Sequence, residues 1–164
     1  KAGDIFLNDV DSQLLSAANL QSNIAYVPQT AQLFQQTIRE NLTFGRQDIS
    51  DESIWNLAEA CGMKERLLAC EQGLDTVIKS PADFSAGEGQ RLELMRALLK
   101  NASCYIFDEP TSNLDSLNEA ILIDLIKTHC QGLVFLISHR PSTLACADQL
   151  FYVRNGSLKE VKEI

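Results

Sequence analysis

The chain has 164 residues, of which 45% are apolar, and it contains no low-complexity tract, so it suits one globular domain with a sizeable core. Fourteen basic and twenty-two acidic residues give a net charge of −8 without a basic cluster, which disfavours electrostatic binding to a nucleic-acid backbone. No apolar run approaches the roughly eighteen residues that a membrane-spanning helix needs.

Cysteine usage points to a reducing compartment. The five cysteines form no Cys-x-x-Cys pair, and their odd number leaves at least one of them unpaired. A cytosolic setting therefore fits this segment best. The cysteines are Cys61, Cys70, Cys104, Cys130 and Cys146.

The first part of the chain predicts short elements that lead into a strand. Residues 3–9 alternate weakly and end in a turn pair, which is typical of a short strand. Residues 11–22 are polar with scattered leucines and indicate a short helix or an irregular link. The apolar run from Ile24 to Val27 predicts a strand that leads into Gln29.

Between residues 37 and 99 the apolar period becomes helical. Ser50 is predicted to cap a helix that Gly62 ends, and a further turn or two follows before a loop over residues 74–84. Another helix is predicted to start near Gly87, with leucines and a methionine on its apolar face. We expect residues 37–99 to form a helical subdomain that is inserted into a sheet domain.

The last third alternates strands and helices, which favours a parallel sheet. An apolar run from Cys104 to Phe107 predicts a buried strand, and a second strand is predicted at residues 133–138. Between them, Ser116 to Glu119 resembles a capping box that opens a helix to about residue 127. A short helix capped by Ser142 and a hairpin turning at Asn155 and Gly156 are predicted to follow.

Three predicted strands each lead into a polar side chain that could contact a ligand. Asp108 and Glu109 end the strand from Cys104, His139 follows the last strand, and Gln29 follows the first. In open parallel sheets, ligands bind in the crevice outside the carboxyl ends of the strands. The alternative for the acidic pair is a core strand with a solvated turn, and for the histidine a structural role.

Small residues open the helix at Phe84-Ser85-Ala86-Gly87-Glu88-Gly89-Gln90-Arg91. Ser85 and Glu88 also have the spacing of a capping box, so a purely structural role accounts for them as well. Both interpretations share one physical basis, because a helix start exposes amides and a partial positive charge that favour an anion. Arg91 and Arg96 are interpreted as supports for this helix rather than as catalytic arginines.

With these motifs in place, nearly the whole chain resembles the nucleotide-binding domain of ABC ATPases. Residues 26–45 and 73–78 resemble the exporter-type branch especially. The matching motifs are Asp108 with the Walker B aspartate, Glu109 with the adjoining catalytic glutamate, Ser112 to Asp115 with the D-loop, His139 with the switch histidine, Gln29 with the Q-loop glutamine, and Phe84 to Glu88 with a variant of the LSGGQ signature.

The resemblance implies an α/β fold of the P-loop NTPase type, RecA-like and ABC-type. Its partial parallel-sheet core would come from residues 1–36 and 100–164. By the same resemblance, the chain would be the carboxyl-terminal portion of the ATP-hydrolysing domain of an ABC transporter that acts as an exporter. The transmembrane domains would lie in the same parent chain, and this domain would lie on the cytoplasmic face of the inner membrane.

The same resemblance assigns roles in hydrolysis, with ATP as substrate and Mg²⁺ as cofactor. Asp108 and Gln29 would hold Mg²⁺, Glu109 would direct the attacking water, and His139 would contact the γ-phosphate. A second nucleotide-binding domain would pair head to tail with this one. The residues implied in nucleotide contacts, besides Gln29, are Ser85, Ala86, Gly87, Glu88 and Asp115, with Ala86 and Glu88 replacing the usual glycine and glutamine.

One expected motif is missing. A P-loop has the pattern G-x-x-x-x-G-K-[ST], and no glycine of this chain is followed by lysine. We expect a fragment that starts after the P-loop and is inactive alone; a protein that has lost nucleotide binding is the alternative.

Two other functions compete with transport. Nucleic-acid-linked ABC ATPases insert coiled coils or zinc modules between the Q-loop and the signature. Only the fifty-five residues from 30 to 84 separate Gln29 from Ser85 here, without heptads or zinc spacing. A non-catalytic interaction module is the other alternative, and the retained Asp108, Glu109 and His139 argue against it.

Overall fold

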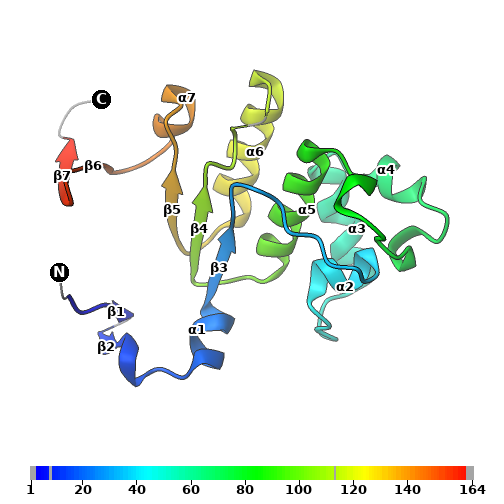
Figure 1. Cartoon of the computed structure of the whole chain (residues 1–164), viewed down its shortest axis with the longest axis horizontal. Coiled ribbons are helices and arrows are strands. Elements are labelled where there is room, and N and C mark those ends of the chain that lie inside the picture. Colours follow the sequence, from blue (N-terminus) through cyan, green and yellow to red (C-terminus); the bar gives the residue numbers. More distant parts are fainter. Residues whose placement is uncertain (1–2, 8, 113, 162–164) are drawn as a thin grey trace.

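A three-stranded parallel sheet lies at the centre of the computed structural model, which describes residues 3–7, 9–112 and 114–161. Figure 1 shows the three strands side by side and running the same way. This arrangement confirms the predicted α/β class with a parallel sheet. In spatial order the strands are β3 (Ile24–Val27), β4 (Cys104–Asp108) and β5 (Leu133–Ile137).

Most of the helices lie in the long connection between β3 and β4. Figure 1 shows them gathered to one side of the sheet, beyond β3. They fall within residues 37–99, and the division of the chain into a sheet core and a helical subdomain stays a prediction. These helices are α2 (Ile38–Thr43), α3 (Asp51–Ala60), α4 (Lys64–Leu68) and α5 (Ala86–Leu99), with short 3₁₀ turns η2 (Gly73–Asp75) and η3 (Pro81–Asp83) between them.

The remaining elements are a link between β4 and β5 and two small hairpins. Helix α6 (Ser116–His129) connects β4 to β5, and α7 (Pro141–Leu144) follows β5. The predicted hairpin at Asn155 and Gly156 is confirmed, with both residues at positive φ. Asn8, in the first predicted strand, lies outside the described residues. The other elements are β1 (Phe6–Leu7), β2 (Val10–Asp11), η1 (Ser12–Leu14), α1 (Ala17–Asn23), β6 (Leu150–Arg154) and β7 (Ser157–Val161).

Helix α5 is at the centre of the core. Leu92, Leu94 and Met95 point in different directions around this helix, yet all three are almost fully buried. They share the core with Tyr105 and Phe107 of β4, which confirms that this strand is buried. A helix that is apolar on several sides must be covered by several partners, so α5 fixes the sheet and the other helices relative to one another.

One face of the sheet remains open to solvent among the described residues. Phe135 and Ile137 of β5 are each 51% exposed, and Tyr26 of β3 is 54% exposed. Their neighbours Val134 and Leu136 pack against the core instead. This pattern follows from the alternation of side chains along a strand. Within the described residues, no helix is long and apolar enough to cross a membrane.

The predicted helix starts are partly confirmed. Ser50 caps α3, and Ser85 caps α5 in a reciprocal capping box with Glu88. The prediction of a capping box at Ser116 is wrong, because Asp115 is the N-cap of α6 and its carboxylate accepts from the amide of Asn118. An aspartate is as good a cap as a serine, so the local pattern permitted both.

The predicted cap of the short helix after β5 is also wrong. Arg140 occupies the N-cap position of α7 and makes no side-chain capping bond. Pro141 takes the first helical position, where its fixed φ suits the start of a helix. Ser142 lies inside the helix, and its hydroxyl donates to Glu119 of α6 at 2.5 Å.

Candidate functional site

The carboxyl ends of the three central strands meet at one edge of the sheet. Val27 pairs with Phe107, and Asp108 pairs with Ile137, so the three strands end nearly level. Asp108 is the last residue of β4. Gln29 and His139 each follow the end of their strand by two residues, at the same edge.

Glu109 and His139 contact each other at this edge. Nδ1 of His139 donates to Oε1 of Glu109 at 2.9 Å. The histidine side chain is 75% exposed, whereas that of Glu109 is 18% exposed. The carboxylate is therefore mostly shielded from bulk water, while the outer part of the imidazole faces solvent.

The backbone of Glu109 has an unusual conformation that sets this contact. Its φ is 50°, in the left-handed region, which costs a residue other than glycine about 1–3 kcal/mol. Its amide donates to the carbonyl of Ile137 at 2.9 Å, so the end of β5 holds this turn in place. The turn carries the Glu109 side chain out of the strand alternation to the end of β5.

Asp108 has a partner that the sequence did not predict. The hydroxyl of Tyr26 donates to Oδ2 of Asp108 at 3.2 Å. Desolvation, followed by this hydrogen bond and the carboxylate charge, raises the pKa of Tyr26 above its ordinary value. Tyr26 pairs with Ile106, two residues before Asp108, so both side chains lie on one face of the sheet. Only the register of the two strands reveals the contact between Tyr26 and Asp108.

Unsatisfied buried atoms mark the same region. Among the described residues, three buried side-chain atoms lack a hydrogen-bond partner, namely Oε2 of Glu109, Oγ of Ser112 and Oε1 of Gln90. Buried polar atoms are normally paired, so such orphans indicate where a water or a ligand belongs. Two of the three lie within the turn that follows β4.

The carboxylates at this edge fit Mg²⁺ as it is bound beside nucleotides. The described residues contain no group of three or more histidine, cysteine, aspartate or glutamate side chains arranged to hold a metal ion. Mg²⁺ at phosphate sites, however, is held by one or two carboxylates, with waters and substrate phosphates completing the octahedron. Asp108 offers such a carboxylate, and the next residue, Glu109, has a buried Oε2 without a partner.

The segment that begins at Gln29 packs closely against helix α5. Gln90 donates from Nε2 to the carbonyl oxygen of Gln29 at 3.3 Å, while the Gln29 side chain is exposed. A Cβ on Gly89 would come within 3.1 Å of the Ala31 side chain, which shows how near the backbone of α5 lies. Gln90 was not predicted to contribute, and its place in the amphipathic pattern of α5 gave no signal.

The start of α5 is held by contacts within the chain. Ser85 accepts from the Glu88 amide, and the Ser85 amide donates to Oε2 of Glu88 at 2.7 Å. Oε1 of Glu88 also pairs with Arg66 at 3.2 Å. Burial acts to raise the pKa of Glu88, but the Ser85 hydrogen bonds and the Arg66 charge outweigh it and leave the pKa below its ordinary value. Ala86 and Gly87 form the first turn.

Asp115 is connected to this same helix. Its carboxylate caps α6 through Asn118, and Oδ1 of Asn118 accepts from Arg91 of α5 at 2.5 Å. Asn113, in the predicted D-loop, lies outside the described residues. Within those residues, no hydrogen bond or ion pair joins the start of α5 or Asp115 to Glu109 or His139. The predicted site residues therefore form two groups.

Comparison with known proteins finds ABC transporters among the relatives of this chain. A family model described as "ABC transporter" matches residues 1–112. A probable ABC transporter ATP-binding/permease protein of Haemophilus influenzae is 37% identical over 160 residues, which are 96% of this chain and 29% of that protein. An ATP-dependent lipid A-core flippase of Chromobacterium violaceum is 38% identical over 164 residues, covering 97% of this chain and 28% of the flippase.

A solved structure agrees with these relatives. A bacterial Atm1-family ABC exporter with ATP bound superposes with a TM-score of 0.86 at 28% identity, over 97% of this chain and 28% of the exporter chain. The present chain thus spans less than a third of the length of each of these proteins.

Proposed function

Because this chain belongs to the ABC transporter family, as part of an exporter-type nucleotide-binding domain, we propose that its parent protein hydrolyses ATP to drive export across a membrane. The observation that supports hydrolysis best is the Glu109 carboxylate. One of its oxygens is bound by His139, and the other is buried without a partner. A carboxylate in that state can accept a proton from a water that it also orients.

Phosphoryl transfer to water depends on positioning and charge more than on covalent chemistry. Glu109 would hold the attacking water through Oε2 and take its proton as the water oxygen bonds to the γ-phosphorus. The bond from that phosphorus to the bridging oxygen breaks in the same step, and ADP leaves. His139 would fix the Glu109 carboxylate through Nδ1 and present its exposed side to the γ-phosphate. Asp108 and Gln29 would hold Mg²⁺, whose charge offsets that of the phosphates.

The second group of residues would act on another nucleotide. Within the described part of the chain, no hydrogen bond or ion pair joins the start of α5, at Ser85 to Glu88, or Asp115 to Glu109 or His139. We assign them to the γ-phosphate side of ATP held by a second nucleotide-binding domain, paired head to tail with this one. Helix starts favour anions, and α5 is fourteen residues long.

The membrane part of the transporter would belong to the same parent chain. The relative from Haemophilus influenzae combines ATP-binding and permease functions in its name, and this chain matches 29% of it. By this likeness, the domain would lie on the cytoplasmic face of the membrane, where ATP is available. Its transmembrane partners would select the substrate.

The direct test measures ATP hydrolysis by the complete protein that contains this chain. Glu109→Gln should lower kcat by about 100-fold or more, since a positioned general base contributes about 10²–10⁴-fold. The affinity of this variant for ATP should stay within about twofold of the wild-type affinity, because Glu109 is not assigned a contact that holds the nucleotide. Glu71→Gln, the same change at an exposed position, is the control and should leave kcat unchanged. A wild-type kcat in the Glu109 variant would refute the proposal.

A further inference from the structure

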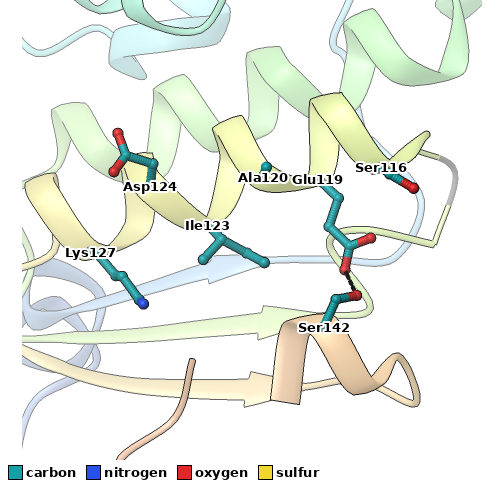
Figure 2. A pocket seen from close by; sticks show the side chains of 7 residues that line it. All are labelled: Ser116, Glu119, Ala120, Ile123, Asp124, Lys127 and Ser142. Carbon is teal, nitrogen blue, oxygen red and sulfur yellow. Dashed lines mark hydrogen bonds between the residues drawn. The ribbon is translucent and has the colours of Figure 1, made fainter. Parts of the chain in front are cut away.

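Glu119 is a buried carboxylate that the hydrolytic scheme does not use. It lies in the first turn of α6 and is only 4% exposed. The hydroxyls of Ser142 and Thr143 donate to its Oε1 at 2.5 and 2.7 Å, and Arg140 pairs with its Oε2 at 3.0 Å. Figure 2 shows the Glu119 side chain reaching from α6 to Ser142 on α7. These contacts, led by the Ser142 hydrogen bond, hold the pKa of Glu119 below its ordinary value.

Arg140 connects the same cluster to the turn after β4. Its Nη1 donates to the carbonyl oxygens of Thr111 at 2.6 Å and Leu114 at 3.1 Å. The hydroxyls of Thr111 and Thr143 lie 3.0 Å apart, and neither residue is exposed. The segment that starts at Arg140 is thus tied to the turn after β4 and to the start of α6 by hydrogen bonds that are buried or partly buried, and those made by Arg140 and Glu119 are charge-assisted.

These contacts are made by residues that closely follow Glu109 and His139 in sequence. Arg140 directly follows His139, and Thr111 follows Glu109 by two residues. The His139 side chain is largely exposed and is bound only to Glu109 among the described residues, so its position depends on its backbone. The 2.9 Å contact therefore depends on how the two backbone segments are held against each other.

We propose that Glu119 and Arg140 are positioning residues, which set the contact between His139 and Glu109 by fixing the segment after β5 against the turn after β4. This inference rests on the proposed function, since it assigns to the cluster an effect on hydrolysis. Neither residue touches the reacting groups. Arg140 spans the two segments, and Glu119 holds Arg140 and the start of α7 in place.

The test uses the complete protein with Glu119→Gln, which keeps the size of the side chain and removes its charge. We expect kcat for ATP hydrolysis to fall about tenfold, because small displacements of catalytic groups have effects of this order or larger. The dissociation constant for ATP should stay within about twofold. Asp124→Asn is the matched control, because Asp124 is exposed on the same helix and borders the same cavity of about 400 Å³ as Glu119 (Figure 2).

A second background separates positioning from general structural damage. The rate of hydrolysis is measured by single turnover, which reaches slow rates, in His139→Ala and in the double variant that also carries Glu119→Gln. The two rates should differ by less than about twofold, because Glu119 acts through His139. If Glu119→Gln does not fold, Ser142→Ala removes a single hydrogen bond to Glu119 and should give a smaller loss of kcat with the same background dependence.

Two results would overturn the inference. One is a wild-type kcat in Glu119→Gln and Ser142→Ala, and the other is an equal loss with and without His139. Failure of the proposed function is recognised separately, because Glu109→Gln would then hydrolyse ATP as the wild type does.

Discussion

At the scale of single residues, Glu109 combines two features that each cost free energy. Its backbone is left-handed, and its buried Oε2 is unpaired. An unsatisfied buried group costs about 1–3 kcal/mol, and the backbone conformation costs a similar amount. Costs of this kind persist where the surrounding structure enforces them, and functional sites are where they gather.

The free-energy cost of the left-handed backbone at Glu109 can be measured separately from the role of its carboxylate in hydrolysis. Glu109→Gly and Glu109→Ala both remove the carboxylate, but only glycine takes φ of 50° without penalty. The free energy of opening the turn after β4 should therefore be about 1–2 kcal/mol higher in the glycine variant than in the alanine variant. Hydrogen exchange of the Ser112 amide, which donates to the Glu109 carbonyl, reports this difference. Equal or greater protection in the alanine variant would contradict the conformation described.

At the scale of elements, a buried ion pair joins α5 to the segment that follows Gln29. Arg96 and Glu93 lie 2.7 Å apart on α5, with side chains 9% and 3% exposed. Glu93 accepts from the Gln32 amide, and Arg96 donates to the carbonyl oxygens of Gln32 and Asn41. The pair thus holds the Gln29 segment and α2 against the helix that begins at Ser85.

Removing one partner of this pair should cost more than removing both charges. Arg96→Met leaves a buried carboxylate without its cation, which typically costs about 3–5 kcal/mol. Adding Glu93→Gln should recover part of that loss, so that the double variant is more stable than Arg96→Met. Hydrogen exchange of the α5 amides measures the local free energy of opening. Additive losses from the two changes would show that the residues are not coupled.

The elements also show which features can be predicted from sequence. Parallel strands end at a common edge, so the presence of Asp108 and His139 at one edge of the sheet follows from apolar runs and their order. The predictions of caps at Ser116 and Ser142 are wrong. The N-cap of α6 is the neighbouring Asp115, which the local pattern permitted equally, whereas the Ser142 hydroxyl is bound to Glu119, a partner that only the fold brings near. Contacts such as that between Tyr26 and Asp108 depend on strand register, which a local pattern does not encode.

At the scale of the whole molecule, the proposed function requires the described residues to supply half of each of two nucleotide sites. One half would be the sheet edge with Asp108, Glu109 and His139, and the other would be the start of α5 with Asp115. The apolar face of β5, with Phe135 and Ile137 about half exposed, lies open within the described part of the chain. No glycine followed by lysine is present to cradle a phosphate. For this reason the 164 residues alone should hydrolyse little ATP.

We propose above that Glu109, held by His139, directs the hydrolytic water. The most direct measurement is the chemical identity of the nucleotide that stays bound after the complete protein is incubated with Mg²⁺ and ATP and passed through a desalting column. Wild-type protein should yield ADP, whereas Glu109→Gln should retain intact ATP, because binding survives and hydrolysis does not. Recovery of ADP from Glu109→Gln in the same proportion as from the wild type would contradict the claim.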